Sequence, residues 1–183
     1  MIEKYKELAK QEHSTRKQVL TLAAVGPVIV VAIPLLIVWA AGVLDRGLGL
    51  PRLNLGAGNA IAGAALIAVG AFLGLWSVVA EITIGQGTPV PLAPTKKLVV
   101  RAPFTYCRNP MTLGTFILYL GICAWLGSLS AAVIVVLLTG LLLVYIKLVE
   151  EKELAARFGE EYLAYKQDTP FILPRLRRPG RKN

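Results

Sequence analysis

The sequence predicts an all-α integral membrane protein with about four transmembrane helices, an N-terminal interfacial helix and a C-terminal cytosolic helix. Three observations carry this prediction. The 183 residues are 55% hydrophobic and 17% charged, with a mean hydropathy of +0.61, which is too apolar for a soluble domain of this size. Apolar residues gather in runs that reach or approach the length of a bilayer span. Basic residues flank those runs, and the length fits a single membrane domain, residues 1–183.

The first element is a charged segment, residues 1–17, whose polar and basic residues suit a short helix lying on the lipid headgroups. The first span follows at residues 19–44, where the apolar run is long enough to cross the bilayer. Pro27 and Pro34 lie inside this run. They predict kinks, because proline has no backbone N–H to donate to the preceding turn.

The second span is predicted at residues 59–84. Gly63, Gly70 and Gly74 form a stripe of small residues within it, a pattern that lets two helices approach closely. Packing within the chain is favoured over a dimer interface. Glu81, near the end of the run, is the only acidic residue inside a predicted span, where a carboxylate is costly.

The remaining elements alternate between surface and membrane. Residues 85–110 are polar, proline-rich and basic, so they form a surface segment rather than lipid-exposed backbone. Two apolar runs, 111–126 and 129–149, predict a tight helical hairpin, although the first is short for a span and is expected to be tilted or only partly inserted. Residues 150–175 are amphipathic and then proline-containing, and they predict a cytosolic helix followed by a basic tail.

The distribution of charge sets the predicted topology. Of the 20 Lys and Arg residues, 5 lie in residues 1–17, 4 in 85–110 and 9 from Lys147 onward, but only 2 in 45–57. The positive-inside rule therefore places both termini and the central loop on the cytoplasmic side. Despite the net charge of +9, the protein is not expected to bind nucleic acid, because the sequence shows no basic groove interleaved with aromatic residues. The lipid bilayer is the expected partner, because basic residues flank the spans on the cytoplasmic side.

Two cysteines, Cys107 and Cys123, and one histidine, His13, do not form a close-spaced set, so no metal site is expected. Cys123 lies in an apolar run and reads as a small core residue. Cys107 lies beside Arg108, a position where a thiol could be mildly activated.

Two strings of residues carry the chemistry. The first joins Gly85-Gln86-Gly87-Thr88-Pro89, Lys96-Lys97-Leu98-Val99-Val100-Arg101 and Tyr106-Cys107-Arg108-Asn109-Pro110-Met111, with Gly114 shortly after. The second is Glu150-Glu151, followed by Phe158-Gly159-x-Glu161-Tyr162-x-x-Tyr165. Over residues 85–175, they resemble the membrane superfamily of isoprenylcysteine carboxyl methyltransferases and phospholipid N-methyltransferases, in its bacterial-type Gly-x-Gly-Thr-Pro and Arg-Asn-Pro-Met variant.

The resemblance implies S-adenosylmethionine as methyl donor, held in a cytosol-facing pocket between the loop, the paired glutamates and the C-terminal helix. The acceptor is then expected to enter from the lipid. The residues expected to bind the cofactor are Gly87, Leu98, Val99, Val100, Tyr106, Asn109, Gly114, Glu150, Glu151, Tyr162 and Tyr165.

The chemistry of the donor makes these residue types sensible, because it carries a sulfonium, an ammonium, a carboxylate and an adenine. Glu150 and Glu151 can accept hydrogen bonds from its amino or ribose groups, and Arg108 can hold its carboxylate or an anionic acceptor. Tyrosines can wall the adenine or the sulfonium. The alternatives are a solvated helix start for the glutamates and an anchor to lipid phosphate for Arg108.

Two departures from the family bear on catalysis, for which Arg108 and Glu81 are the candidate residues. Asn109 stands where better-known members carry His, so no general base is expected there, and catalysis would rest on alignment and desolvation. Tyr145 stands near the place of an Arg suited to a substrate carboxylate, so an amine or thiol acceptor becomes competitive. For an amine, Glu81 is the candidate to bind the ammonium or take its proton.

The expected function is therefore methyl transfer from S-adenosylmethionine at the membrane interface to a phospholipid amine, an isoprenylcysteine-type carboxylate or a lipophilic thiol. Two alternatives stay open. One is an NADPH-dependent enzyme like the sterol reductases, whose C-terminal membrane architecture looks similar. The other is a non-catalytic membrane scaffold that packs through Gly70-xxx-Gly74.

Overall fold

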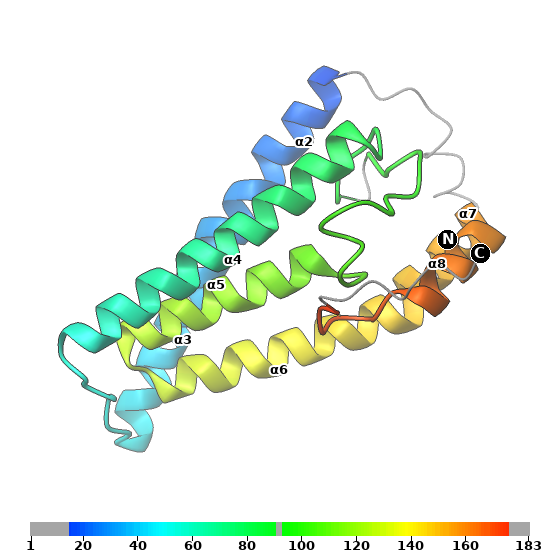
Figure 1. Cartoon of the computed structure of the whole chain (residues 1–183). Coiled ribbons are helices and arrows are strands. Elements are labelled where there is room, and N and C mark those ends of the chain that lie inside the picture. The colour runs from blue at the N-terminus through cyan, green and yellow to red at the C-terminus, as the bar shows by residue number, and fades with distance from the viewer. Residues whose placement is uncertain (1–14, 91–92, 176–183) are drawn as a thin grey trace. The chain divides into compact units, whose positions relative to one another are not determined.

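The computed structural model describes residues 15–90 and 93–175, and the regular secondary structure in those ranges is helical throughout (Figure 1). The elements are α2 (Thr15–Pro27), η1 (Val28–Ala32), α3 (Ile33–Leu48), α4 (Ala57–Thr83), α5 (Pro110–Leu126), α6 (Leu129–Tyr145), η2 (Ile146–Glu150), α7 (Glu151–Phe158) and α8 (Glu160–Asp168). The predicted all-α fold class is confirmed. The interfacial segment predicted at 1–17 lies largely outside the described residues, as does the basic tail.

Three helical stretches are long and apolar enough to cross a membrane: Gln18–Leu48, Ala57–Thr83 and Leu129–Phe158. The fourth apolar helix, α5, has 17 residues. At 1.5 Å per residue it is about 25 Å long, slightly short of a hydrocarbon core of about 30 Å. The chain is therefore an integral membrane protein, and the predicted weakness of the third span has a structural basis.

The first span contains the irregularity that its prolines predict. Between α2 and α3 the chain forms the π-helical turn η1, in which the N–H of Ile33 donates to the carbonyl of Val28, five residues earlier. Pro27 ends α2 and Pro34 lies in the first turn of α3. Because neither proline has an N–H to donate, a wider turn between them accommodates the missing hydrogen bonds.

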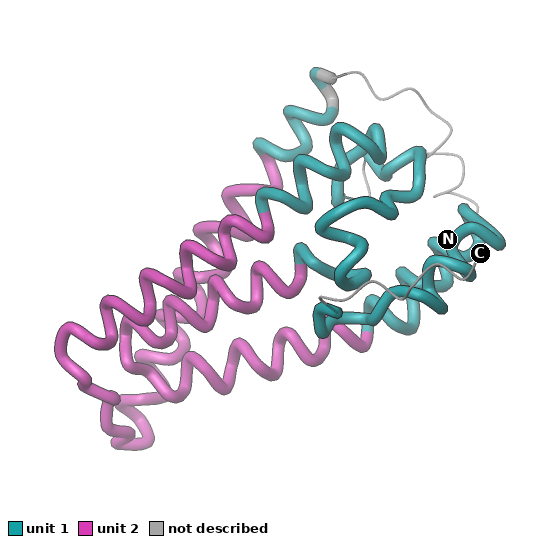
Figure 2. The backbone as a smooth tube through the Cα atoms, in the orientation of Figure 1, with its two compact units in different colours: residues 1–23, 75–111, 145–183 teal, residues 24–74, 112–144 magenta. Residues whose placement is uncertain are grey.

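The described residues fall into two compact units (Figure 2). Unit 1 contains described residues 15–23, 75–111 and 145–175, and unit 2 contains residues 24–74 and 112–144. The long helices α4 and α6 each contribute residues to both units. The prediction that residues 1–183 form a single membrane domain stays a prediction.

Unit 2 is built on close helix packing between α4 and α5. A Cβ atom at Gly70 would lie 2.5 Å from the carbonyl oxygen of Gly114, and one at Gly63 would lie 2.7 Å from Cβ of Trp125. A Cβ atom at Gly114 would in turn lie 2.7 Å from the backbone N of Gly74. The predicted stripe of small residues therefore serves packing within the chain.

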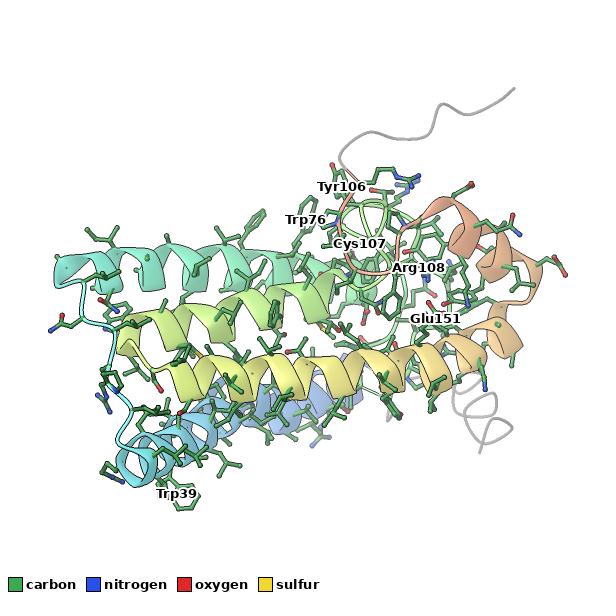
Figure 3. All side chains as sticks on the ribbon, turned by 90° about the horizontal axis from the view of Figure 1, so that it is seen from below. Trp39, Trp76, Tyr106, Cys107, Arg108 and Glu151 are labelled. Atoms are coloured by element: carbon green, nitrogen blue, oxygen red, sulfur yellow. The ribbon has the colours of Figure 1, made fainter. Side chains whose placement is uncertain are left out.

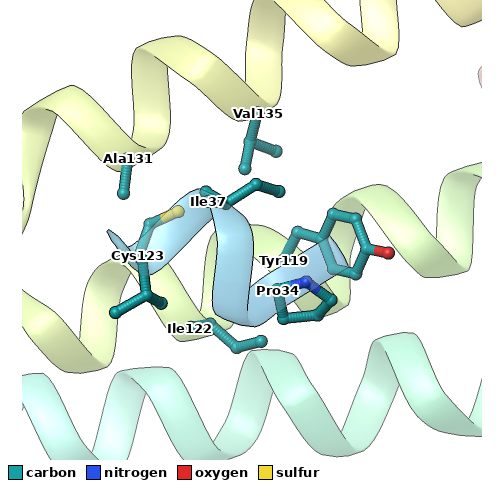
Figure 4. A pocket seen from close by; sticks show the side chains of 8 residues that line it. Pro34, Ile37, Tyr119, Ile122, Cys123, Ala131 and Val135 are labelled. Carbon is teal, nitrogen blue, oxygen red and sulfur yellow. The ribbon is translucent and has the colours of Figure 1, made fainter. Parts of the chain in front are cut away.

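The apolar core of unit 2 gathers five buried residues from α3, α5 and α6: Ile37, Ala41, Cys123, Ala131 and Val135. A small apolar pocket lies among these helices, with Pro34 and Tyr119 also in its lining (Figure 4). At the Gly127 turn, the hydroxyl of Ser128 donates to the carboxylate of Asp45 over 2.8 Å. This bond ties the end of α3 to the start of α6.

Candidate functional site

The last turns of α4 enter unit 1 and supply part of its core. Ala80 packs with Val99 and Phe104 of the central loop, and Ile84 and Tyr165 pack against this cluster. Residues 80 and 84 lie one turn apart, so they share the helix face that meets the loop. This face positions the loop against the C-terminal helices.

Gly87 permits a close approach of the loop to itself. A Cβ atom there would lie 2.5 Å from Cα and N of Thr95. The neighbouring Gln86 has a φ of 56°, a left-handed conformation that the two flanking glycines help the chain to reach. The N–H of Lys96 then donates to the carbonyl of Gly85 over 2.7 Å. The Gly-x-Gly string therefore shapes the loop.

A second π-helical turn, η2, lies directly before Glu151. The N–H of Glu151 donates to the carbonyl of Ile146, five residues earlier. Both side chains are 4% exposed. The i→i−5 bond places residues five apart on neighbouring turns, so a buried apolar residue and a buried carboxylate share one face of the helix. Glu151 thereby points into unit 1.

Arg108 binds the buried carboxylate of Glu151 (Figure 3). Nε and Nη2 donate to Oε1 of Glu151 over 3.1 and 2.6 Å. Nη1 donates to the carbonyl oxygens of Lys166 and Thr169, each over 2.7 Å. The side chains of Arg108 and Glu151 are 12% and 4% exposed. One guanidinium therefore ties the central loop to α7 and to the end of α8.

One further contact joins α8 to α7, and another joins the C-terminal segment to the loop. Nζ of Lys166 lies 2.7 Å from Oε2 of Glu151, so both oxygens of this carboxylate are paired. Nδ2 of Asn109 donates to the carbonyl of Phe171 over 2.8 Å. Sequence reasoning missed Lys166 and Phe171, because nothing in their spacing shows how α8 packs on α7 or where the chain returns after α8.

The loop is also fastened from α7. Arg157 donates from Nη2 to the carbonyl of Thr95 and from Nη1 to Glu153 over 3.2 Å. The spacing of four residues between Glu153 and Arg157 predicts a side-chain pair on a helix. Nothing in the sequence predicts the bond to Thr95. Arg157 therefore holds the far end of the Gly-x-Gly loop.

Not every carboxyl group in unit 1 is paired. Oε2 of Glu81 is buried and has no hydrogen-bond partner among the described residues. Glu150, next to the fully paired Glu151, makes no hydrogen bond or ion pair within the described part of the chain. The site thus contains one saturated carboxylate and two that can still accept.

Aromatic residues surround these groups. Tyr162 is 1% exposed, and its ring centroid lies 6.3 Å from that of Tyr165. The hydroxyl of Tyr165 donates to the carbonyl of Phe104 over 2.8 Å. Burial raises the pKa of both tyrosines above its usual value, and the negative charge of Glu151 adds to the effect on the pKa of Tyr162. Both phenols therefore remain neutral at physiological pH.

The loop carries a third tyrosine and a buried thiol. The ring of Tyr106 meets that of Trp76 edge-on, with centroids 6.4 Å apart (Figure 3). Cys107 is 1% exposed, and burial raises the pKa of its thiol. The activation considered for this thiol is therefore wrong, since it is held in the protonated form.

The structure brings most of the predicted site residues into unit 1. They are Glu81, Gly87, Leu98, Val99, Val100, Tyr106, Arg108, Asn109, Glu150, Glu151, Tyr162 and Tyr165. Val99 is a core residue, whereas Val100 is 43% exposed. Gly114 belongs to unit 2, where it packs against Gly70 and Gly74. The roles assigned to these residues stay predictions.

The fold and the site define an all-α integral membrane protein with a cluster of carboxyl groups, aromatic rings and two arginines that bind glutamates. The chain belongs to the phospholipid methyltransferase family, whose model matches residues 59–161, more than half of its length. It is therefore a membrane methyltransferase in the general sense, and the resemblance noted from the sequence is confirmed. No curated protein and no solved structure matches the chain.

Proposed function

We propose that this protein transfers a methyl group from S-adenosylmethionine to a lipophilic acceptor at the cytoplasmic membrane interface. Membership of the phospholipid methyltransferase family supports a methyl donor and a lipid acceptor. The charge distribution supports a site on the cytoplasmic side, because the central loop and the segment after α6 carry most of the Lys and Arg residues. The acceptor is a phospholipid amine, an isoprenylcysteine-type carboxylate or a lipophilic thiol.

The observation that carries the proposal is the set of carboxyl groups around Glu151. The donor presents an ammonium, a sulfonium and ribose hydroxyls, all of which bind to acceptors or negative charge. Glu150 and Glu81 are the groups with free acceptor capacity, and Glu151 is held in place between Arg108 and Lys166. The residues present therefore fit the donor.

Arg108 acts in this proposal as a positioning residue. All three of its nitrogens donate to Glu151, Lys166 or Thr169, so its guanidinium orients the loop and the glutamate pair. Tyr162 and Tyr165 contribute apolar walls with neutral hydroxyls, which suit an adenine ring or a sulfonium.

When bound, the donor supplies a methyl carbon that forms a bond to the acceptor's nucleophilic atom while its bond to sulfur breaks, leaving a neutral thioether. The chain's own residues bind, orient and exclude water. Asn109 cannot titrate, and its amide N donates to the carbonyl of Phe171, so it takes no proton from the acceptor. Alignment and a dry site are therefore the main sources of acceleration.

The test uses purified full-length protein in phospholipid nanodiscs, S-adenosylmethionine labelled in the methyl group, and a total lipid extract. Label should enter the organic phase with wild-type protein and fall at least about tenfold with Glu151→Gln, since the held carboxylate is lost. Glu160→Gln, at an exposed position of α8, is the matched control and should leave the rate unchanged. Folded wild-type protein that labels no lipid fraction would refute the proposal.

A further inference from the structure

Glu81 is a buried carboxyl group that none of the contacts holding unit 1 together uses. Its Oε2 atom has no hydrogen-bond partner, and none of the ion pairs among the described residues includes it. A carboxylate is costly to bury unless it is paired, so its place in the structure calls for a partner.

The helix geometry directs Glu81 into unit 1. It follows Ala80, which is 4% exposed, and precedes Ile84, and both of these residues pack in the cluster around Val99 and Phe104. Positions 80, 81 and 84 lie on one side of the turn that ends α4, where the N–H of Ile84 donates to the carbonyl of Ala80. The carboxyl group therefore faces the interior that also holds the glutamate pair.

The charged group that acts on Glu81 is a second carboxyl group. Glu150 is close enough for its negative charge to act on Glu81, and it is itself unpaired within the described ranges. Glu151 differs, because Arg108 and Lys166 take up both of its oxygens. Glu81 and Glu150 are thus two neighbouring carboxyl groups that form no ion pair among the described residues.

No basic side chain among the described residues forms an ion pair with Glu81. Arg108 and Lys166 pair with Glu151, and Arg157 donates to Glu153 and to the carbonyl of Thr95. Nε of Arg157 is buried without a hydrogen-bond partner, but the charge of Arg157 acts on Glu150 and not on Glu81. These three side chains therefore leave Glu81 without a counterion.

We infer that Glu81 is a specificity-determining residue that binds the positively charged group of a ligand. The inference rests on the proposed function, because the ligand is either the methyl donor or the acceptor. The shared chemistry is an onium group: the sulfonium or ammonium of the donor, or the protonated amine of a lipophilic acceptor. In each case the cation replaces the missing hydrogen-bond partner of Oε2 and lowers the repulsion from Glu150.

The experiment compares full-length wild-type protein with Glu81→Gln in detergent micelles. Gln has the same shape without the charge. Glu160→Gln, an exposed acidic residue of the same unit, controls for the change of net charge. Binding is measured for S-adenosylmethionine, for S-adenosylhomocysteine, which lacks the charge on sulfur, for dodecylamine and for dodecanol, its neutral counterpart.

Glu81→Gln should weaken the binding of a cationic probe at least about tenfold and leave dodecanol within about twofold of wild type. Loss of S-adenosylmethionine binding alone identifies the sulfonium as the partner. Equal loss for both adenosyl compounds identifies the donor's ammonium, and loss for dodecylamine alone identifies an amine acceptor. Each of these outcomes supports the inference.

Three results would overturn it. One is that all four probes bind Glu81→Gln within about twofold of wild type. Another is an equal loss in Glu160→Gln, and the third is wild-type protein that binds none of the cationic probes. Because Gln removes a buried charge, Glu81→Gln should unfold at a temperature no lower than wild type, which separates lost binding from lost folding.

The two proposals fail separately. If wild-type protein binds dodecylamine through Glu81 but neither adenosyl compound, the proposed function fails and this inference stands. If wild-type protein binds S-adenosylmethionine and every probe ignores the Glu81 substitution, only this inference fails.

Discussion

Units 1 and 2 are held together by different kinds of contact. In unit 2, glycines of α4 and α5 bring two helix backbones together, and an apolar core from three helices fills the rest. In unit 1, two arginines, a lysine and two glutamates join irregular loop segments to short helices. Those contacts of unit 2 are steric and apolar, whereas the polar contacts of unit 1 position groups that can bind a ligand.

The largest effect on stability is expected from removing the ion pair between Arg108 and Glu151, the clamp of unit 1. Arg108→Ala leaves Glu151 buried with only Lys166 as a partner, which should cost about 3–5 kcal/mol of stability. Hydrogen exchange should speed up in residues 145–171 and change little in unit 2. Thermal unfolding of the purified protein gives the total loss.

Two variants sharpen this prediction. Arg101→Ala removes an exposed arginine from the same loop and should cost almost nothing. Arg108→Ala combined with Glu151→Ala should cost less than the sum of the single changes, because the unpaired carboxylate disappears. A fully additive double variant would contradict the account of the clamp.

An intermediate effect is expected from the packing of unit 2. Gly70→Ala places a Cβ atom 2.5 Å from the carbonyl oxygen of Gly114, so the two helices must separate at a cost of about 1–3 kcal/mol. Gly140→Ala is the matched control, since a Cβ atom there meets nothing within 4 Å. Equal melting temperatures for the two variants would show that the α4 and α5 backbones are not in close contact.

The smallest effect is expected at Tyr165. Tyr165→Phe removes the hydrogen bond to the carbonyl of Phe104 and should cost about 1 kcal/mol at neutral pH. Burial raises the pKa of this phenol above its usual value of 10.0, so the folded state favours the neutral form. The contribution of Tyr165 to stability should therefore be constant between neutral pH and pH 10 and fall above pH 10, as the unfolded chain ionises first.

Urea unfolding at several pH values checks this prediction. The Phe variant should lose less stability than wild type between neutral pH and pH 11. A wild-type protein whose stability does not fall above pH 10, or a variant with the same pH profile, would show that Tyr165 is not buried as described.

The sequence carried the information for the fold because long apolar runs have few structural solutions in a bilayer. It also indicated that the central loop and the glutamate pair share a site, through the positive-inside rule and the family motifs. The sequence did not predict the pairing of Lys166 with Glu151, which depends on how α8 turns back on α7 at Gly159. It did not predict the bond from Asn109 to Phe171 either, which depends on where the chain returns after α8. The π turn before Glu151 was equally hidden, because residues 146–150 read as an ordinary apolar helix end.

Gly87 and Gly114 also show what the sequence could not predict. Both were expected to admit a cofactor, yet their missing Cβ atoms accommodate Thr95 in one case and Gly70 with Gly74 in the other. A glycine in a motif signals close approach, but the sequence does not say what approaches.

Hydrogen exchange with and without saturating S-adenosylmethionine tests whether unit 1 holds the methyl donor, as we propose. In full-length protein in nanodiscs, the donor should slow exchange in residues 81–109 and 145–171 and leave residues 24–74 and 112–144 unchanged. Protection confined to unit 2, or no protection anywhere in folded protein, would contradict the claim.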